Sequence, residues 1–381
     1  MVAFRARRAG LRRPFLACLC FLALAACARD PHPEASKPKL VSYDLPSEDP
    51  VREIGATQAL AAAGRLWLLG RGGGLASFAL ADNSRQDVFA SGVLFLAKSN
   101  GTLWALRSTE LRYREMEDPP TRFPIGGTFV VSRWAGESFE DSPPLKLSEM
   151  PMALAVTKEG ARIVVSPHRI HTLPDGSRRW ASRKLKGPDE PLGPPSTAAI
   201  AMVGDDLFLG FNFGEFGGGL RKISLSTGIA RNIAYKIGQE SCAGCDSITG
   251  IIADPAAPGC ILASSGLIHM MSWGRVLQIC DDRAAVKFEK TFSVDWAGKS
   301  TEMTVPFFGL AAVPSGGFWA IAPGTLYRFE GQTPKEYPLP EPKSVNGLLF
   351  SRDLPGVIVV YTNANQAFSL SGTTPMLVTL D

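Results

Sequence analysis

The sequence contains few of the residues and motifs on which most active sites depend. It has four histidines among 381 residues, and it contains no GxSxG elbow, Walker loop, HExxH helix or calcium loop. It also lacks a strong charge of either sign, because 40 basic residues face 36 acidic ones. These absences predict no cofactor, no metal site and no nucleic-acid partner.

Helical patterns are missing as well. No 15-residue window repeats apolar residues at i, i+3, i+4 and i+7. Instead, short runs rich in Val, Ile, Leu and Phe alternate with turn residues, and the chain contains 38 Gly and 29 Pro. This pattern is typical of an all-β domain.

The first 26 residues have the features of an export signal. Five arginines precede an apolar run of about 12 residues (Phe15 to Ala26), which suits a signal-peptide core and is too short to span a bilayer. The run ends in Leu24-Ala25-Ala26-Cys27, which resembles the lipobox of bacterial lipoproteins. The resemblance implies cleavage before Cys27 and lipidation of Cys27, and Ala28 resembles the pattern sent on to the outer membrane.

Two other interpretations of the leader remain open. It could be an ordinary secretory signal that happens to contain a cysteine. Arg12-Arg13-Pro14-Phe15-Leu16 also resembles the core of a twin-arginine signal, although the usual Ser/Thr before the pair and Lys after it are missing. Because the leader holds five arginines and no acid, its removal changes the formal charge from +4 to −1.

The remaining chain is predicted to form a tether and one large domain. Residues 27–40 carry the lipidated Cys27 and three prolines, with little to bury, so we expect a flexible tether. Residues 41–381 then form the domain. The alternative, a disordered N-terminus, predicts the same behaviour for residues 27–40.

A four-strand pattern recurs through this domain. Residues 197–235 read as four strands (TAAIAMV, DLFLGF, LRKISLS and IARNIAY) joined by hairpin turns. Four antiparallel strands in about 40 residues form one propeller blade. Other quartets are expected to begin near Thr57, Val93, Met152, Ile248, Phe308 and Val345.

These quartets predict an all-β β-propeller. We favour seven four-stranded blades, with six or eight possible, and expect residues 41–45 to close the ring as a strand on the last blade. Residues 116–150 and 282–304 fit no quartet and are expected to be insertions. The rival fold is a large β-sandwich. The rhythm resembles the WD40/YVTN-like propellers at the level of architecture, and it identifies no subfamily.

Seven cysteines raise the question of pairing. Four lie in the domain (Cys242, Cys245, Cys260 and Cys280), and disulfides are the default outside the cytoplasm. With strands expected at 247–253, 259–264, 267–272 and 275–280, Cys260 and Cys280 fall at opposite ends of strands that are not neighbours. We therefore expect Cys280 to bond to Cys242 or Cys245. A redox CxxC lacks its strand-to-helix setting, and a zinc site lacks a second close pair.

The remaining polar residues give weak signals for catalysis. His168 and His171 are three residues apart, which on a strand places them on opposite faces and makes them a poor metal pair. His269 lies in the apolar run LIHMM and is expected to be a core or channel residue. Asp205-Asp206 suits a turn, and Asp281-Asp282 is expected to be solvated.

The expected order of strands within the blades predicts a binding face. It is the face that carries the loops between second and third strands and the loops between blades. These loops include Arg71 to Gly74, Asn212 to Gly219, Ser264 to Gly266, Asn363 to Asn365 and the Cys242–Cys245 segment. The candidate binding residues are Arg71, Asn212, Glu215 and Phe216, because aromatic and Arg anchors beside small residues suit recognition of a protein loop or a glycan. These loops could equally be plain hairpin turns.

Two functions follow from these patterns. The first is a lipid-anchored binding or scaffold module of the bacterial envelope, at the outer membrane facing the periplasm, with a protein or glycan partner. The alternative is an envelope lyase or hydrolase with a polar site in the propeller channel, where His269 and Arg71 would be the first suspects. A cluster of His, Arg and carboxylates in the channel would favour the enzyme.

Overall fold

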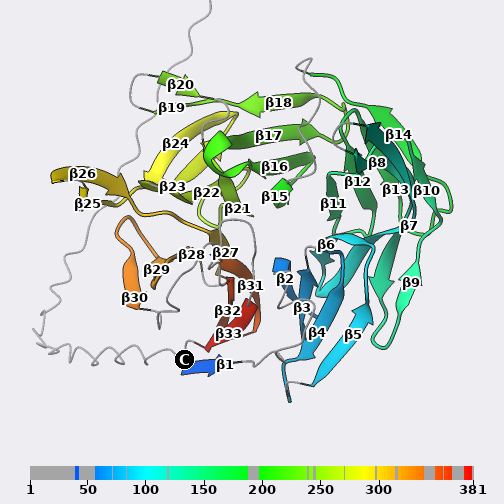
Figure 1. Ribbon diagram of the computed structural model, residues 1–381, viewed down its shortest axis with the longest axis horizontal. Helices are drawn as coiled ribbons and strands as arrows, with labels where there is room; N and C mark the ends of the chain where they lie inside the picture. Colours follow the sequence, from blue (N-terminus) through cyan, green and yellow to red (C-terminus); the bar gives the residue numbers. More distant parts are fainter. Residues whose placement is uncertain are drawn as a thin grey trace, which may run out of the picture. The chain divides into compact units, whose positions relative to one another are not determined.

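The computed structural model is built of β-strands, shown in Figure 1. It describes residues 39–42, 56–70, 72–82, 84–117, 120–187, 197–237, 240–242, 246–269, 271–296, 298–313, 316–338, 348–354, 356–362 and 373–379. Residues Lys37–Asp381 form one compact unit. Within the described ranges the only helix is a single 3-10 turn, η1 (Gly214–Phe216).

The sheet of β15 (Thr197–Val203), β16 (Asp206–Asn212), β17 (Gly218–Ser224) and β18 (Ala230–Ile233) shows how the sequence forms a blade. The five central residues of β16, from Leu207 to Phe211, are all buried, so side chains on both faces of the sheet are covered. Leu207 and Leu209 pack with Val165 of the preceding sheet, and Phe208 packs with Ile248 of the following sheet. A sheet that is apolar on both faces must lie between two neighbours, which is the physical basis of a propeller.

The other sheets repeat this arrangement with the same antiparallel order. One four-stranded sheet near the start of the domain consists of β2 (Ala56–Ala62), β3 (Arg65–Gly70), β4 (Leu75–Ala79) and β5 (Arg85–Phe89). The sheet directly before β15–β18 consists of β11 (Ala153–Val156), β12 (Arg162–Ser166), β13 (Arg169–Leu173) and β14 (Ala181–Lys184). The four-stranded sheet after β15–β18 consists of β21 (Ile248–Ala253), β22 (Ile261–His269), β23 (Met271–Cys280) and β24 (Arg283–Phe288).

Two further four-stranded sheets and one five-stranded sheet complete the set. They are β27 (Gly309–Ala312), β28 (Phe318–Ala322), β29 (Thr325–Phe329) and β30 (Lys335–Pro338); β31 (Leu348–Leu354), β32 (Gly356–Thr362), β33 (Thr373–Thr379) and β1 (Lys39–Ser42); and β6 (Val93–Ser99), β7 (Thr102–Glu117), β8 (Pro120–Trp134), β9 (Phe139–Asp141) and β10 (Leu145–Leu147). Each predicted quartet start lies within three residues of the first strand of a sheet.

The first strands of these sheets contact one another in a closed cycle, from β2 through β6, β11, β15, β21 and β27 to β31, which returns to β2. The fold prediction is therefore confirmed as an all-β propeller, in which the described residues form six four-stranded blades and one broader blade of five strands. β1 pairs with β33 in antiparallel register, from Lys39 opposite Thr379 to Ser42 opposite Met376. This pairing joins the two ends of the domain in one sheet, as expected, although the strand begins at Lys39.

Two hairpins extend beyond their blades. The β7–β8 ladder continues from Trp104 opposite Arg133 as far as Glu117 opposite Pro120, and the β22–β23 ladder ends only at His269 opposite Met271. Residues 116–150 therefore include blade strands, and residues 283–288 form the blade strand β24, so the expected insertions are only partly correct. Two separate hairpins are true additions to the blades: β19 (Tyr235–Ile237) with β20 (Glu240–Cys242), and β25 (Thr291–Trp296) with β26 (Lys299–Thr304).

The cysteine prediction is wrong. Cys260 and Cys280 form a disulfide, with Cα atoms 4.6 Å apart. The error lies in the strands: residues 261–280 form two long strands rather than three short ones. Ile261 therefore lies opposite Ile279, and Cys260 and Cys280 occupy the next position of the same hairpin. Cys242 pairs through its backbone with Tyr235 in the β19–β20 hairpin, and Cys245 lies outside the described residues.

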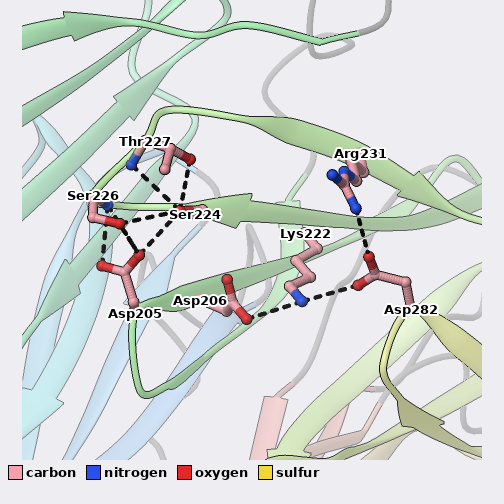
Figure 2. A network of polar contacts seen from close by, with 8 residues as sticks. All are labelled: Asp205, Asp206, Lys222, Ser224, Ser226, Thr227, Arg231 and Asp282. Carbon is pink, nitrogen blue, oxygen red and sulfur yellow. Dashed lines mark hydrogen bonds and ion pairs between the residues drawn. The ribbon is translucent and has the colours of Figure 1, made fainter.

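Figure 2 shows a polar network that joins the β15–β18 sheet to the next one. The Lys222 ammonium lies 2.9 Å from a carboxylate oxygen of Asp206 and 2.9 Å from one of Asp282, while Arg231 lies 3.1 Å from the other Asp282 oxygen. Asp281 and Asp282 both have positive φ in the two-residue turn between β23 and β24. Asp282 is thus a clamp between sheets. Asp281 is exposed as expected, whereas Asp282 is only partly exposed because it is held in these ion pairs.

These ion pairs change the pKa values of their members. Burial alone would lower the pKa of Lys222, but hydrogen bonds to Asp282 and Asp206 outweigh burial and raise it. Burial alone would raise the pKa of Asp282, but hydrogen bonds from Lys222 and Arg231 outweigh burial and lower it. Both shifts favour the charged forms, so the clamp keeps its ion pairs around neutral pH.

Candidate binding face

The antiparallel order of a blade decides which loops share a face. Successive strands run in opposite directions, so the turn between second and third strands lies at the same end as the connection to the next blade. In this chain that end carries η1, the tips of the β7–β8 and β22–β23 hairpins, and the β25–β26 hairpin. We call it the η1 face. The opposite end carries the turns at Asp205 and Asp282, and we call it the clamp face.

Phe216 is the most exposed large apolar side chain of the described residues, at 85% exposure. It ends η1, the turn between β16 and β17. Gly214 and Gly217 have φ values of +64° and +90°, which side-chain-bearing residues rarely adopt, so two glycines reverse the chain on either side of Glu215 and Phe216. The amide oxygen of Asn212 accepts a hydrogen bond from the Gly214 N–H at 2.9 Å. The turn is thus defined by its own backbone while Phe216 faces solvent.

Buried polar groups fix η1 from below. The Ser247 hydroxyl lies 2.7 Å from the carbonyl oxygen of Gly214 and 3.0 Å from that of Gly217, and Ser247 is almost fully buried. Next to it, the buried carboxylate of Asp246 accepts a hydrogen bond from Ser265 and lies 3.3 Å from the Arg275 guanidinium. Because Ser265 and Arg275 belong to β22 and β23, this network also holds the base of the β22–β23 hairpin.

Other apolar side chains accompany Phe216 on the η1 face. Five more are between 38% and 49% exposed: Tyr113 and Phe123 on the β7–β8 hairpin, Ile268 and Met271 on the β22–β23 hairpin, and Phe292 on β25. Outside this face, the large apolar side chains of comparable exposure in the described residues are Ile229 and Val286. Apolar residues grouped at one end of a molecule mark an interaction site more often than scattered ones do.

The structure places some of the predicted binding-face residues together and does not describe others. Asn212, Glu215 and Phe216 lie together at η1, where Asn212 shapes the turn and Glu215 is exposed. Arg71, Asn363–Asn365 and the segment 243–245 lie outside the described residues. Ser264 to Gly266 is not a loop, because these residues lie inside β22 and Ser264 and Ser265 are fully buried.

The first strands line a central cavity of about 340 Å³. Its walls are mainly aliphatic, for example Leu60, Ile200 and Met202. The polar side chains among the described lining residues are Thr57, Gln58 and Thr249, and the charged one is Lys98. His269 is the last residue of β22, a second strand, and lies opposite Met271 at the end of the β22–β23 hairpin. The cluster of His, Arg and carboxylates that the enzyme alternative requires is therefore not found among the described lining residues.

A chain of hydrogen bonds connects two histidines beside the β12–β13 turn. Glu149 accepts hydrogen bonds from the Ser166 hydroxyl at 2.9 Å and from the ring of His168 at 2.5 Å. The ring of buried His171 lies 3.5 Å from the Ser166 oxygen and 2.7 Å from that of Ser182. Burial, reinforced by the charge of Arg169, lowers the pKa of His171 to about 4.

This chain of hydrogen bonds has a structural character. Burial would raise the pKa of Glu149, but hydrogen bonds from Ser166 and His168 outweigh it and lower the pKa. The carboxylate is therefore charged and fully engaged at neutral pH. Ser166 and His171 are both almost completely buried, so a substrate could not reach the Ser166 hydroxyl. Within the described residues no cluster of three or more His, Cys, Asp or Glu could hold a metal ion.

The sequence did not predict that several residues of the η1 face lie there. Ile268, Met271 and Phe292 lie in segments that had been split at glycine or set aside as insertions. The available signal was that the stretch from Ile261 to Met271 contains no Pro, Asn or Asp, which suits a long strand better than two short ones. Asp246 and Ser247 gave no signal, because burial decides their role.

Comparisons with known proteins support the fold. Neither a protein-family model nor a curated protein matches this chain. Among solved structures, the WD40 repeats of RRP9 superpose with a TM-score of 0.57 at 10% identity, covering 91% of this chain and 100% of that one. YCF48 from Cyanidioschyzon merolae gives 0.51 at 10% identity, covering 89% of this chain and 98% of that one.

A bacterial structure is similar to the same degree. The extracellular domain of BT4673 from B. thetaiotaomicron gives a TM-score of 0.53 at 12% identity over 88% of this chain. This chain spans 39% of the BT4673 chain. At such identities the similarities concern the fold alone, and together with the strand order they show that this chain is a WD40-like β-propeller.

Proposed function

We propose that this protein is a lipid-anchored β-propeller of the bacterial envelope that binds a partner protein through its η1 face. The observation that carries the proposal is Phe216, which is 85% exposed on a turn that Ser247 and Asn212 hold in one conformation. Burying a Phe side chain contributes roughly 1.5–3 kcal/mol. An ordered, exposed Phe is thus suited to serve as an anchor in a partner's pocket.

The surroundings of Phe216 favour a protein over a glycan. Ile268 and Met271 extend from the neighbouring β22–β23 hairpin, and η1 contacts β22. Aliphatic and thioether side chains pack well against other side chains, whereas sugars need flat rings combined with many hydrogen-bond donors and acceptors. A similar propeller, YCF48, has been solved bound to D1 peptide, with a TM-score of 0.51 over 91% of this chain. This supports peptide binding as a function that the fold can perform.

The anchor rests on the leader. Leu24-Ala25-Ala26-Cys27 follows a basic start and an apolar core, and two acyl chains on Cys27 would anchor the domain stably. The structure contains no helix, in the part it describes, with the length and apolarity needed to cross a bilayer. Residues 28–40 would serve as the tether, and Ala28 favours the outer membrane.

Photo-crosslinking tests the proposed face. A photoreactive phenylalanine analogue replaces Phe216 in one variant and Val286 in the matched control, because Val286 is also an exposed apolar residue but lies on the blade strand β24. We expect a discrete crosslinked protein from position 216 that is absent from position 286. Equal products from both positions, or none from either, would contradict the proposed face.

Acyl labelling tests the anchor separately. Cells fed an alkyne-bearing fatty acid should label the wild-type chain and leave Cys27→Ala unlabelled. The Cys27→Ala chain should also keep its leader, since cleavage depends on the lipidated cysteine. Labelling that persists in Cys27→Ala would contradict the anchor while leaving the η1 face untouched.

A further inference from the structure

The outer hairpin of the β11–β14 sheet carries a concentration of positive charge. Between Arg169 and Lys186 the chain contains one acidic residue, Asp175. The same stretch contains six exposed cations, which we call the basic edge: Arg169, Arg178, Arg179, Arg183, Lys184 and Lys186. The near-neutral charge of the whole domain conceals this local excess.

The acids near the basic edge that the structure describes are engaged by other groups. Asp175 lies 3.0 Å from the Arg162 guanidinium, which is not part of the edge. Glu149 accepts hydrogen bonds from Ser166 and His168. Asp205 accepts hydrogen bonds from the hydroxyls and backbone of the β17–β18 turn, while the charge of Arg183 helps to lower its pKa. In the described residues no ion pair within 4 Å neutralises a cation of the basic edge.

The strand register places these charges against one another. Arg169 lies directly opposite Lys184 across the β13–β14 ladder, and Arg183 lies opposite Ile170. Like charges that face each other across two strands destabilise the pair. Since successive residues of a strand point to opposite faces, cations line both sides of β14, and all four β14 residues are exposed. The fold therefore retains an arrangement that costs stability.

Protection of an edge strand does not explain the whole set. Charged residues on an outer strand prevent unwanted pairing with other chains, and Arg183 and Lys184 on β14 meet that need. Arg178 and Arg179 lie in the connection before β14, where they protect no ladder. Lys186 lies beyond β14, and its backbone already forms a bridge with Ile229 of the next sheet. The presence of these three cations calls for an anionic partner.

We propose that the basic edge binds the headgroups of anionic phospholipids. Several Lys and Arg side chains spread over an exposed edge match a surface of many separate negative charges, and their attractions to such a surface accumulate. The assignment to a membrane rests on the proposed function, because a lipid on Cys27 would keep the domain within reach of a bilayer. A lipid chain combined with a basic patch also anchors more firmly than a single chain does.

Vesicle co-sedimentation tests this proposal without the anchor. The chain from Ala28 to Asp381 contains the whole compact unit of Lys37–Asp381, so it is suitable without leader or lipid. Its binding is measured to vesicles of phosphatidylcholine alone and of phosphatidylcholine with one third phosphatidylglycerol. The test variant is Arg178→Gln/Arg179→Gln/Lys184→Gln/Lys186→Gln. The control removes the same charge from exposed positions on other sheets: Arg133→Gln/Arg283→Gln/Lys299→Gln/Lys335→Gln.

We expect the unsubstituted chain to bind the anionic vesicles and not the neutral ones, with binding lost in 0.5 M salt. The test variant should bind at least tenfold more weakly, and the control should change by less than threefold. Equal weakening in both variants, equal binding to both vesicles, or no binding to the anionic vesicles would each overturn the proposal. Phe216→Ser should bind the vesicles normally, so that failure here remains distinct from failure of the η1 face.

Discussion

The two ends of the β15–β18 sheet differ in whether their side chains find partners inside the protein or face solvent. At the clamp face, Asp205, Asp206 and Lys222 all have partners within the protein, and the network continues to Asp282 of the next sheet. At the η1 face, the Ser247 hydroxyl also holds the backbone of the turn, yet the Phe216 side chain contacts mainly solvent. At one end the side-chain contacts thus hold neighbouring sheets together, and at the other the backbone contacts hold an apolar side chain exposed to solvent.

We therefore expect the clamp face to determine the stability of the fold and the η1 face to determine partner binding. Substitutions at the clamp face should lower the free energy of unfolding and leave partner binding intact. Substitutions of exposed residues at the η1 face should do the reverse. A substitution that changes stability and partner binding together would contradict this separation.

The disulfide should have the largest effect on stability. Cys260 and Cys280 are 20 positions apart in the sequence, and Cys280 lies next to the Asp281–Asp282 turn. A loop of this length is worth about 3 kcal/mol in the chain-entropy account. Cys260→Ser/Cys280→Ser should therefore unfold at lower denaturant concentration, with unchanged affinity for the partner. A loss of affinity larger than the loss of folded protein would show that the two ends are coupled.

His171 should make stability depend on pH. Its pKa is about 4 in the folded chain and about 6.5 in an unfolded one, so the unfolded state binds more protons between these values. The free energy of unfolding should fall by about 1–2 kcal/mol from pH 7 to pH 5. Chemical denaturation of the wild type and His171→Gln at both values measures this. If both chains lose stability equally, the buried histidine is not the cause.

The ion-pair clamp should have a smaller effect. Asp282→Asn keeps a residue that tolerates positive φ and removes the charge that holds Lys222 and Arg231. Asp282 is partly exposed, so we expect a loss of about 0.5–1.5 kcal/mol. Asp281→Asn is the matched control, because Asp281 lies in the same turn with positive φ. Equal losses in the two variants would assign the effect to the turn rather than to the clamp.

Strand rhythm was sufficient to predict the blades but not the long hairpins. The quartet at residues 197–235 was predicted almost residue by residue because its turns carry Gly204-Asp205 and Thr227-Gly228. In β22 and β23 the glycines have another cause. A Cβ at Gly266 would lie 2.3 Å from the Phe307 carbonyl oxygen, and one at Gly274 would lie 2.5 Å from the Pro306 Cα. Close approach of another backbone explains these glycines, and interpreting Gly266 as a turn shifted the strands and misplaced the disulfide.

The candidate site was predicted in part for a similar reason. Asn212, Glu215 and Phe216 form a glycine-flanked turn that local sequence reveals. The contact of Lys222 with Asp282 joins residues 60 positions apart, and Ser247 reaches back to Gly214. Such pairs depend on which blades are neighbours and on their exact register. No local pattern contains that information.

The most direct test of the separation compares Phe216→Ser with Val286→Ser. Both remove an exposed apolar side chain, so each should change the free energy of unfolding by less than about 0.5 kcal/mol. Against the protein captured by crosslinking at position 216, we predict that Phe216→Ser weakens binding by at least about 30-fold, the size expected of an anchor residue, while Val286→Ser binds like the wild type. Unchanged binding by Phe216→Ser would contradict the η1 face as the binding site.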